Sequence, residues 1–279
     1  MTVELILIGL LQGLVLAFVA YGVMIPFRLL DFPDLTAEGA YPFGGAIAAS
    51  LIVLGFNPII ALVAAAIGGG LAGMATAYIN LKFRVNSLLA GIIVSTMLYS
   101  INLRFMGKPN VALFNQKILF LGDNIFVKIL LMFGILAILI IPLFLFLRTN
   151  WGLCLRAVGF NSEFAKRHGI SITKWTIFGL FLANAYTGLA GGLMIQVQSY
   201  ADVGMGIGIV IHALAALMIG ESIVGTSTLR HQLLAPLVGA LIYQQIQGAA
   251  LSLGLAPSDF KLLTGGIVLI VIAIGRKRL

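Results

Sequence analysis

Nine long apolar stretches dominate the sequence. Each is close to the length of about 20 residues that a helix needs to cross a bilayer. Lipid offers the backbone no hydrogen-bond partners, so stretches of this kind are expected to be helical. The pattern predicts an all-α, polytopic integral membrane protein with about nine transmembrane helices. The stretches are 4–26, 40–56, 58–81, 86–105, 125–147, 174–198, 207–224, 232–254 and 259–275.

Composition excludes a water-soluble fold. Of the residues, 61% are hydrophobic and 9% are charged, against the roughly 25% charged that soluble domains carry. The net charge of +8 indicates basic cytoplasmic loops rather than a nucleic-acid partner. The first apolar run, 5–25, lacks a basic leader and a small-residue cleavage site, so we interpret it as a retained span.

Basic residues predict the orientation of the chain. Lys82, Arg84, a long polar insert, Arg230 and the end of the chain at 276–278 fall on one side of the predicted membrane, which makes that side cytoplasmic and places the N-terminus outside. The segment 26–38 fits poorly, because its acids outnumber its one arginine. If the first span ran the other way, 26–42 would be a re-entrant segment.

A weak internal similarity suggests two repeats. The stretch 38–55 can be laid on 202–220, and 88–93 resembles 263–268. We therefore expect one transmembrane domain over 1–279, with repeat one at 1–105, a connector at 106–173 and repeat two at 174–279. A single connecting span would invert the second repeat relative to the first. Chance similarity between Gly/Ala/Ile-rich segments is the alternative.

An acid and a glycine begin one span of each repeat, at 38–42 and 202–206. Such residues are typical of a helix that starts late inside the bilayer, or of an ordinary helix start at the interface, which we favour for the acids. Glu4, Glu221 and Asp259 also fall at span ends. The sequence therefore predicts no acid near the middle of a span, which argues against a carrier driven by protons or sodium.

Polar side chains inside spans are the candidates for a solute pathway, with interhelical hydrogen bonding as the simpler role. The candidates are Glu38, Tyr41, Ser95, Asn102, Asn184, Gln196, His212 and Gln244. Small residues four apart, as in Gly69–Gly73 and Gly188–Gly192, predict close helix packing.

No catalytic, metal or cofactor site is evident in the sequence. Three histidines and one cysteine are scattered, which does not suit a metal site. There is no GxxxxGK[ST] phosphate loop and no hydrolytic constellation. We expect a protein that is not an enzyme and binds no cofactor, so the energy for any transport must come from a partner.

The polar insert at 148–174 is the place where a partner is expected. It holds five basic residues and one acid. Within it, Asn161 or Ser162 can cap a short helix over 161–168 that Gly169 ends. Two helical turns are not stable alone in water. The insert therefore predicts a cytoplasmic protein partner.

The run from Gly152 to Ile170 has the pattern G-x-x-x-R-A-x-G-x-N-x-x-x-A-x-x-x-G-I. It resembles a motif of the permease subunits of bacterial ABC importers of the branched-chain amino acid and ribose type. The segments 35–40 and 204–208 are also similar, and the ending at 261–265 is similar to a subgroup associated with tryptophan or tyrosine binding proteins. Two differences stand out. Ser162 replaces a usual proline, and Phe160 stands where a charged residue is frequent.

The resemblance implies a multi-pass subunit of the bacterial cytoplasmic (inner) membrane that pairs with a second copy or a paralogue. Separate ATPase subunits, which hold ATP and Mg, would dock on the insert, and an extracytoplasmic solute-binding protein would deliver a small solute. Aromatic or branched-chain amino acids come first as solute, and ribose-like sugars or nucleosides second. The alternative is a stand-alone secondary carrier or channel.

Nine residues are the expected coupling residues toward the ATPase, with Gly159 as a hinge. They are Arg156, Ala157, Gly159, Asn161, Ser162, Glu163, Ala165, Lys166 and Gly169.

Overall fold

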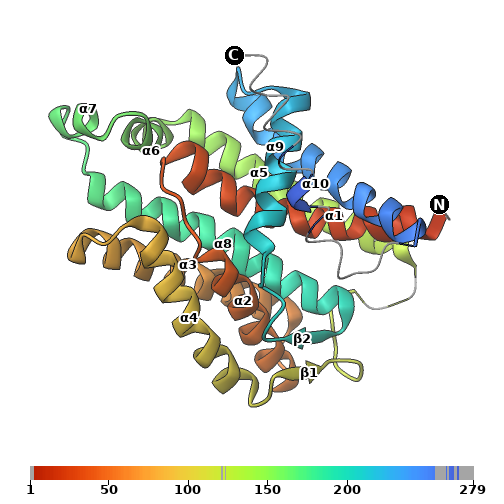
Figure 1. Cartoon of the computed structure of the whole chain (residues 1–279). Helices are drawn as coiled ribbons and strands as arrows, with labels where there is room; N and C mark the ends of the chain where they lie inside the picture. Colours follow the sequence, from red (N-terminus) through yellow and green to blue (C-terminus); the bar gives the residue numbers. More distant parts are fainter. Residues whose placement is uncertain are drawn as a thin grey trace. The chain divides into compact units, whose positions relative to one another are not determined.

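The structure is a computed structural model that describes residues 3–120, 122, 124–254, 262, 264–266 and 269. Its described part is almost entirely helical (Figure 1). The elements in chain order are α1 (Val3–Met24), the π-helical η1 (Ile25–Leu29), α2 (Ala37–Val53), α3 (Pro58–Phe83), α4 (Ser87–Met106), β1 (Asn110–Ala112), α5 (Ile125–Arg148), α6 (Asn150–Phe160), α7 (Ser162–Arg167), α8 (Ile172–Gln198), β2 (Tyr200–Asp202), α9 (Ile209–Val224) and α10 (Leu229–Ser252).

A helix lies at each of the first eight apolar stretches. Among the described residues, five helices are long and apolar enough to cross a membrane, whereas α2 and α9 are shorter. The ninth stretch, 259–275, lies largely outside the described residues. The polytopic helical class is confirmed, while the count of nine and the inverted repeats stay predictions.

The chain divides into two compact units. The first contains residues 1–20, 123–144 and 211–279, and the second contains 21–122 and 145–210. Helices α1, α5 and α9 therefore contribute residues to both units.

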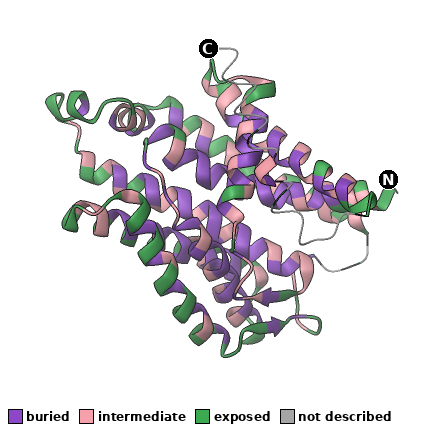
Figure 2. Ribbon diagram, in the orientation of Figure 1, coloured by how far each residue is buried: buried purple, intermediate pink, exposed green. Residues whose placement is uncertain are grey.

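Close approach of α2, α3 and α8 builds the core of the second unit. A Cβ on Gly44 would lie 1.9 Å from the carbonyl oxygen of Gly188, and one on Gly73 would lie 2.1 Å from that of Leu180. Larger side chains at these positions would force the helices apart. The predicted packing role of the small residues is confirmed. Figure 2 shows the result, with α8 buried along most of its length.

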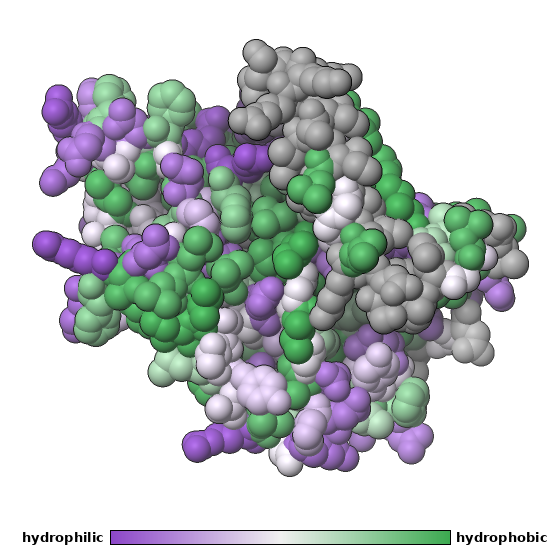
Figure 3. All heavy atoms as spheres, in the orientation of Figure 1, coloured by the Kyte–Doolittle hydropathy of each residue, from purple (hydrophilic) through white to green (hydrophobic). Residues whose placement is uncertain are grey.

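The outer faces of α3 and α4 carry large hydrophobic side chains that no other part of the described chain covers. Figure 3 shows hydrophobic side chains gathered between more hydrophilic ends of this unit. Exposure of such an apolar surface to water would be unfavourable, so the surface suits contact with lipid. Among these exposed residues are Ile59, Ile60, Val63, Ile67, Leu71, Leu88, Leu89, Ile92, Met97 and Ile101.

A small antiparallel sheet lies in the same unit. Asn110 pairs with Asp202, and Ala112 pairs with Tyr200. The side-chain oxygen of Gln196 accepts a hydrogen bond of 2.8 Å from the backbone N–H of Leu119 near this sheet. The sequence did not predict these strands, because three-residue strands form only through a partner far away in the chain.

Side-chain hydrogen bonds also occur in the first unit. Gln244 of α10 donates from Nε2 to Oε1 of Gln12 in α1 at 2.7 Å. Within α10, Gln247 donates to the hydroxyl of Tyr243 at 2.7 Å. The ring of His212 lies 5.8 Å from that of Tyr243. Each of these polar groups has a neighbour within the protein.

Candidate functional site

Helix α2 begins beside the middle of another helix. After η1 ends at Leu29, residues 30–36 are not helical, and α2 starts at Ala37. A Cβ on Gly39 would lie 2.6 Å from Cα of Ser95, which stands near the middle of α4. This arrangement suits a helix that starts late, after a non-helical segment, whereas the favoured position of Glu38 at a membrane interface stays a prediction.

A buried network holds the extended segment in place. Asp34 is 2% exposed, and its carboxyl group accepts a hydrogen bond of 2.8 Å from the N–H of Thr36 and another from the Thr36 hydroxyl. Nδ2 of Asn184 donates to the second carboxyl oxygen at 2.8 Å. The hydroxyls of Thr36 and Thr76 share a hydrogen bond of 2.6 Å. The network joins the segment to α3 and α8.

Asp34 corrects the prediction that no acid lies near the middle of a span. Its partner Asn184 stands close to the centre of α8, so the carboxyl group lies level with the middle of that helix. The sequence places Asp34 in a polar connector and gives no sign that the connector is drawn inward. The role of Asn184 in this structure is to hold Asp34.

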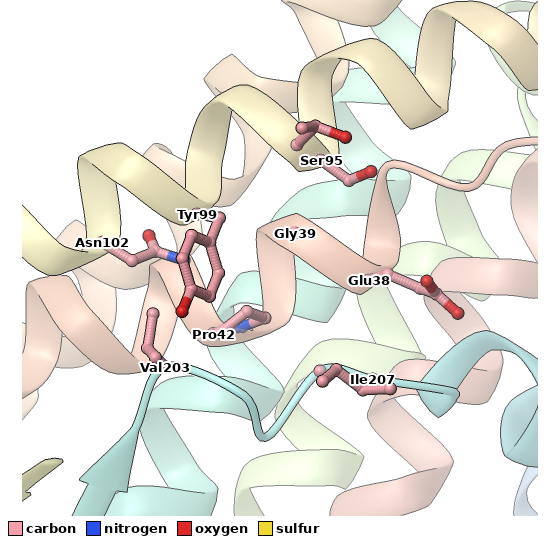
Figure 4. Close-up of a pocket in the computed structure, with 10 residues that line it drawn as sticks. Glu38, Gly39, Pro42, Ser95, Tyr99, Asn102, Val203 and Ile207 are labelled. Carbon is pink, nitrogen blue, oxygen red and sulfur yellow. The ribbon is translucent and has the colours of Figure 1, made fainter. Parts of the chain in front are cut away.

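A pocket of about 270 Å³ opens next to the start of α2 (Figure 4). Three segments of the second unit form it, namely the first turn of α2, one face of α4 and the loop that follows β2. The lining residues are Glu38, Gly39, Pro42, Ser95, Thr96, Tyr99, Asn102, Val203, Gly206 and Ile207. Its size is close to the lower end of the roughly 300–1,000 Å³ common for small-molecule sites.

Proline and glycine shape the pocket wall. Pro42 lies inside α2 and has no N–H, so the carbonyl of Glu38 loses the hydrogen bond that residue 42 would donate. A Cβ on Gly206 would lie 2.1 Å from that carbonyl oxygen. The loop can approach the first turn of α2 only because residue 206 has no side chain.

The structure brings together three of the eight predicted pathway residues, Glu38, Ser95 and Asn102. Tyr41, Asn184 and Gln196 lie in the same unit but do not line this pocket, and all three are buried. The remaining two, His212 and Gln244, belong to the first unit. Sequence reasoning missed Thr96 and Tyr99, although Ser95, Tyr99 and Asn102 recur at the spacing of one helix face.

The polar insert folds into two helices. Thr149 caps α6, and its side chain accepts from the N–H of Gly152. Asn161 caps α7 and accepts a hydrogen bond of 2.9 Å from the N–H of Phe164. The choice between Asn161 and Ser162 is thereby decided for Asn161. The short helix occurs where the cap predicts it.

Gly169 ends α7. The N–H of Gly169 donates to the carbonyl of Lys166, and that of Ile170 donates to the carbonyl of Ala165. This is the Schellman arrangement, and the φ of +77° at Gly169 is one that L-residues with side chains rarely adopt. The predicted stop at Gly169 is confirmed.

The structure sorts the expected coupling residues by exposure. Asn161, Ser162, Glu163, Lys166 and Gly169 are exposed. Ala165 is fully buried, so its side chain anchors α7 and does not face a partner in this structure. Ala157 and Arg156 are half-buried, and Arg156 donates from its guanidinium to the carbonyl of Leu147 at 3.3 Å.

Gly159 packs against the end of η1. A Cβ there would lie 2.1 Å from the carbonyl oxygen of Leu29 and 2.6 Å from Cα of Leu30. Close approach therefore requires a glycine at this position, whereas its role as a hinge stays a prediction. Leu30 also reaches Gly179 of α8, where a Cβ would lie 2.4 Å from Cδ1 of Leu30.

Tryptophans flank the insert. The rings of Trp151 in α6 and Trp175 in α8 meet edge to face with centroids 6.1 Å apart, and Trp151 is 67% exposed. Tryptophan is enriched where membrane meets water. The pair suits an interfacial position for α6, with α7 beyond it.

Comparison with known proteins identifies the family. Residues 5–273 match the model of the family described as branched-chain amino acid transport system / permease component. The chain belongs to this family. The confirmed resemblance makes it a transport permease of the ABC type. Permeases of such systems work with ATPase and solute-binding partners in general.

Individual relatives cover most of the permease. The tyrosine transport system permease protein of Clostridioides difficile (strain R20291) is 40% identical over 95% of this chain and 89% of its own length. The L-arabinose ABC transporter permease protein AraH of Azospirillum brasilense is 25% identical over 96% and 80%. The ribose import permease protein RbsC of Escherichia coli (strain K12) is 25% identical over 88% and 77%. No solved structure gave a significant match.

Proposed function

We propose that this permease is the membrane-spanning subunit of an ATP-driven importer of an amino acid, aromatic or branched-chain. The observation that carries the proposal is α7, a capped and exposed helix of six residues on a chain without a nucleotide-binding loop. The similarity to a tyrosine transport permease supports an amino acid over a sugar, since the arabinose and ribose permeases are more distant.

The surface around α7 suits an ATPase groove. Phe160 is 95% exposed and Phe164 is 54% exposed, and they stand next to the exposed Glu163, Lys166 and Arg167. An aromatic anchor ringed by charges is the composition of a protein interface. Separate ATPase subunits, which bind ATP and Mg, are the occupant that we assign to this surface.

A chain of contacts leads from α7 toward the pocket within the second unit. Helix α6 packs on Leu29 and Leu30 through Gly159. Leu30 is the first residue of the extended segment 30–36. This segment leads into the first turn of α2, which lines the pocket. A shift of α7 driven by the ATPase would reach the pocket by this route, which is the physical connection that coupling requires.

The assembled importer would contain further partners. A second copy of the permease, or a paralogue, would enclose the pathway in the bacterial cytoplasmic membrane, and an extracytoplasmic binding protein would supply the solute. These partners follow the family arrangement.

A stand-alone carrier is the second candidate, and Asp34 is the observation that favours it. A buried acid level with the middle of a membrane helix can bind a coupling ion. However, Asp34 does not line the pocket and already accepts three hydrogen bonds.

Replacing Asn161 and Glu163 together with alanine tests the coupling role. The variant loses the cap and the first-turn acid of α7, which together stabilise the helix by about 1.4 kcal/mol. We therefore expect at least about a tenfold fall in solute-stimulated ATP hydrolysis by the assembled complex. The control is Asn57→Ala, which removes the cap of α3. Unchanged stimulated hydrolysis in the double variant would defeat the proposal.

A further inference from the structure

We propose that the pocket at the start of α2 binds the solute during passage, with the Glu38 carboxylate holding a primary ammonium group and Asn102 holding the solute's carboxylate. The inference rests on the proposed function and goes beyond it by assigning the site and the two groups that recognise an α-amino acid.

Asn102 is the first observation. It is 0% exposed, and neither Oδ1 nor Nδ2 of its amide has a hydrogen-bond partner in the described structure. Leaving a buried amide unpaired costs about 1–3 kcal/mol for each group, and such groups are rare. Since Asn102 lines the pocket, a bound solute can supply the missing partners. Its N–H suits a carboxylate oxygen.

Glu38 is the second observation. It is the one charged residue among the ten that line the pocket, and none of the ten is basic. Its carboxylate makes no hydrogen bond or ion pair with the described residues. An unpaired carboxylate in a pocket without a basic residue favours a solute group with several N–H donors. A primary ammonium has three.

The remaining walls suit the rest of an amino acid. Tyr99, Val203 and Ile207 give apolar surface, and the ring of Tyr99 is half exposed. The hydroxyls of Ser95 and Thr96 donate to the carbonyl of Ile92, so their oxygens can accept further hydrogen bonds. Figure 4 shows Tyr99 and Asn102 on α4 and Glu38 at the start of α2. An amino acid can thus contact charge on one helix and an aromatic face on another.

The test uses the complete transporter, reconstituted in proteoliposomes with its ATPase and binding protein, and radiolabelled tyrosine and leucine as probes. Glu38→Gln and Asn102→Leu are compared with two controls, Glu4→Gln and Ser100→Ala, which are exposed and do not line the pocket. The readouts are amino-acid uptake per ATP hydrolysed, ATP hydrolysis stimulated by the loaded binding protein, and the melting temperature of the detergent-solubilised complex.

We expect Glu38→Gln and Asn102→Leu each to lower uptake per ATP by about tenfold or more, as for the loss of a hydrogen bond to a charged group. Stimulated hydrolysis should persist, and both controls should match the wild type. Asn102→Leu should also raise the melting temperature, because it removes an unpaired buried amide. A residue with only a structural role would not combine a higher melting temperature with lower uptake.

Three results would overturn the inference. Uptake per ATP within twofold of the wild type in both variants would contradict the assignment of the pocket as the solute site, while the proposed importer function would stand. Loss in Asn102→Leu but not in Glu38→Gln would remove the ammonium assignment. Uptake of ribose and of no amino acid by the wild type would overturn the proposed substrate and the pocket assignment together.

Discussion

The extended segment 30–36 and helix α7 are both short polar elements of the same unit, yet they are held in opposite ways. In α7 the cap and the closing hydrogen bonds join residues no more than five positions apart. In the segment, Asp34 and Thr36 bond to Asn184 and Thr76, which are 150 and 40 positions away.

The difference distinguishes a segment that is held by contacts within the chain from a helix whose surface is available to a partner protein. Asp34 and Thr36 of the segment are buried, and their side chains are hydrogen-bonded to α3 and α8. Apart from the buried Ala165, helix α7 is exposed, and Phe164 together with Phe160 at the end of α6 stands in solvent. Replacing the buried side chains of the segment should therefore change folding stability, whereas replacing exposed side chains at α7 should change only that short helix and its interactions with a partner.

The largest effect is expected from Asp34→Ala. The N–H of Thr36 and the amide of Asn184 would each lose a buried acceptor, which costs about 1–3 kcal/mol for each group. The free energy of unfolding should therefore fall by about 2–6 kcal/mol. Thermal unfolding of the detergent-solubilised permease measures this change.

The control for Asp34→Ala is Asp31→Asn. Asp31 is exposed and has a φ of +48°, which asparagine tolerates. Its change should alter stability by less than about 0.5 kcal/mol. Equal shifts in the two variants would erase the proposed contrast between buried and exposed acids.

A smaller effect is expected from Phe160→Ala, and it should appear only in binding. Phe160 would become buried in the complex with the ATPase, and loss of such an aromatic contact costs about 1.5–3 kcal/mol of binding free energy. Affinity for the ATPase subunits should therefore fall by about 10–150-fold, while the melting temperature of the permease alone stays the same. Affinity measured on the detergent-solubilised subunits tests this. Phe114→Ala is the matched control, because Phe114 is 75% exposed and lies far from α7 in the chain. If both variants bind equally well, Phe160 is no anchor.

The smallest effect is expected from Asn161→Ala. Loss of a cap destabilises a helix by about 1 kcal/mol, so amide hydrogen exchange over 162–167 should speed up about fivefold, with no change elsewhere. Ser162→Ala, which removes an exposed hydroxyl that does not cap the helix, should leave the exchange rates unchanged. Faster exchange spread over α6 and α8 as well would mean that α7 is not stabilised independently of its neighbouring helices.

The sequence predicted the elements that are held by local contacts and missed those that are held by distant ones. The helices and α7 were predictable because apolar length, the cap at Asn161 and the stop at Gly169 are local signals. Asp34 was missed because nothing nearby shows that α3 and α8 surround it. Of the pocket, Glu38, Ser95 and Asn102 stood out as polar residues inside spans, whereas Tyr99 did not, since a tyrosine on a membrane helix is common at interfaces. The loop at 203–207 joins them only through tertiary packing.

The central claim is that the permease has no driving force of its own and is moved through α7 by a separate ATPase. The direct measurement is uptake of radiolabelled tyrosine into proteoliposomes that contain the permease and its binding protein, with and without the ATPase and ATP. Accumulation should occur only when the ATPase and ATP are both present. Accumulation driven by a proton or sodium gradient with the permease alone would contradict the claim.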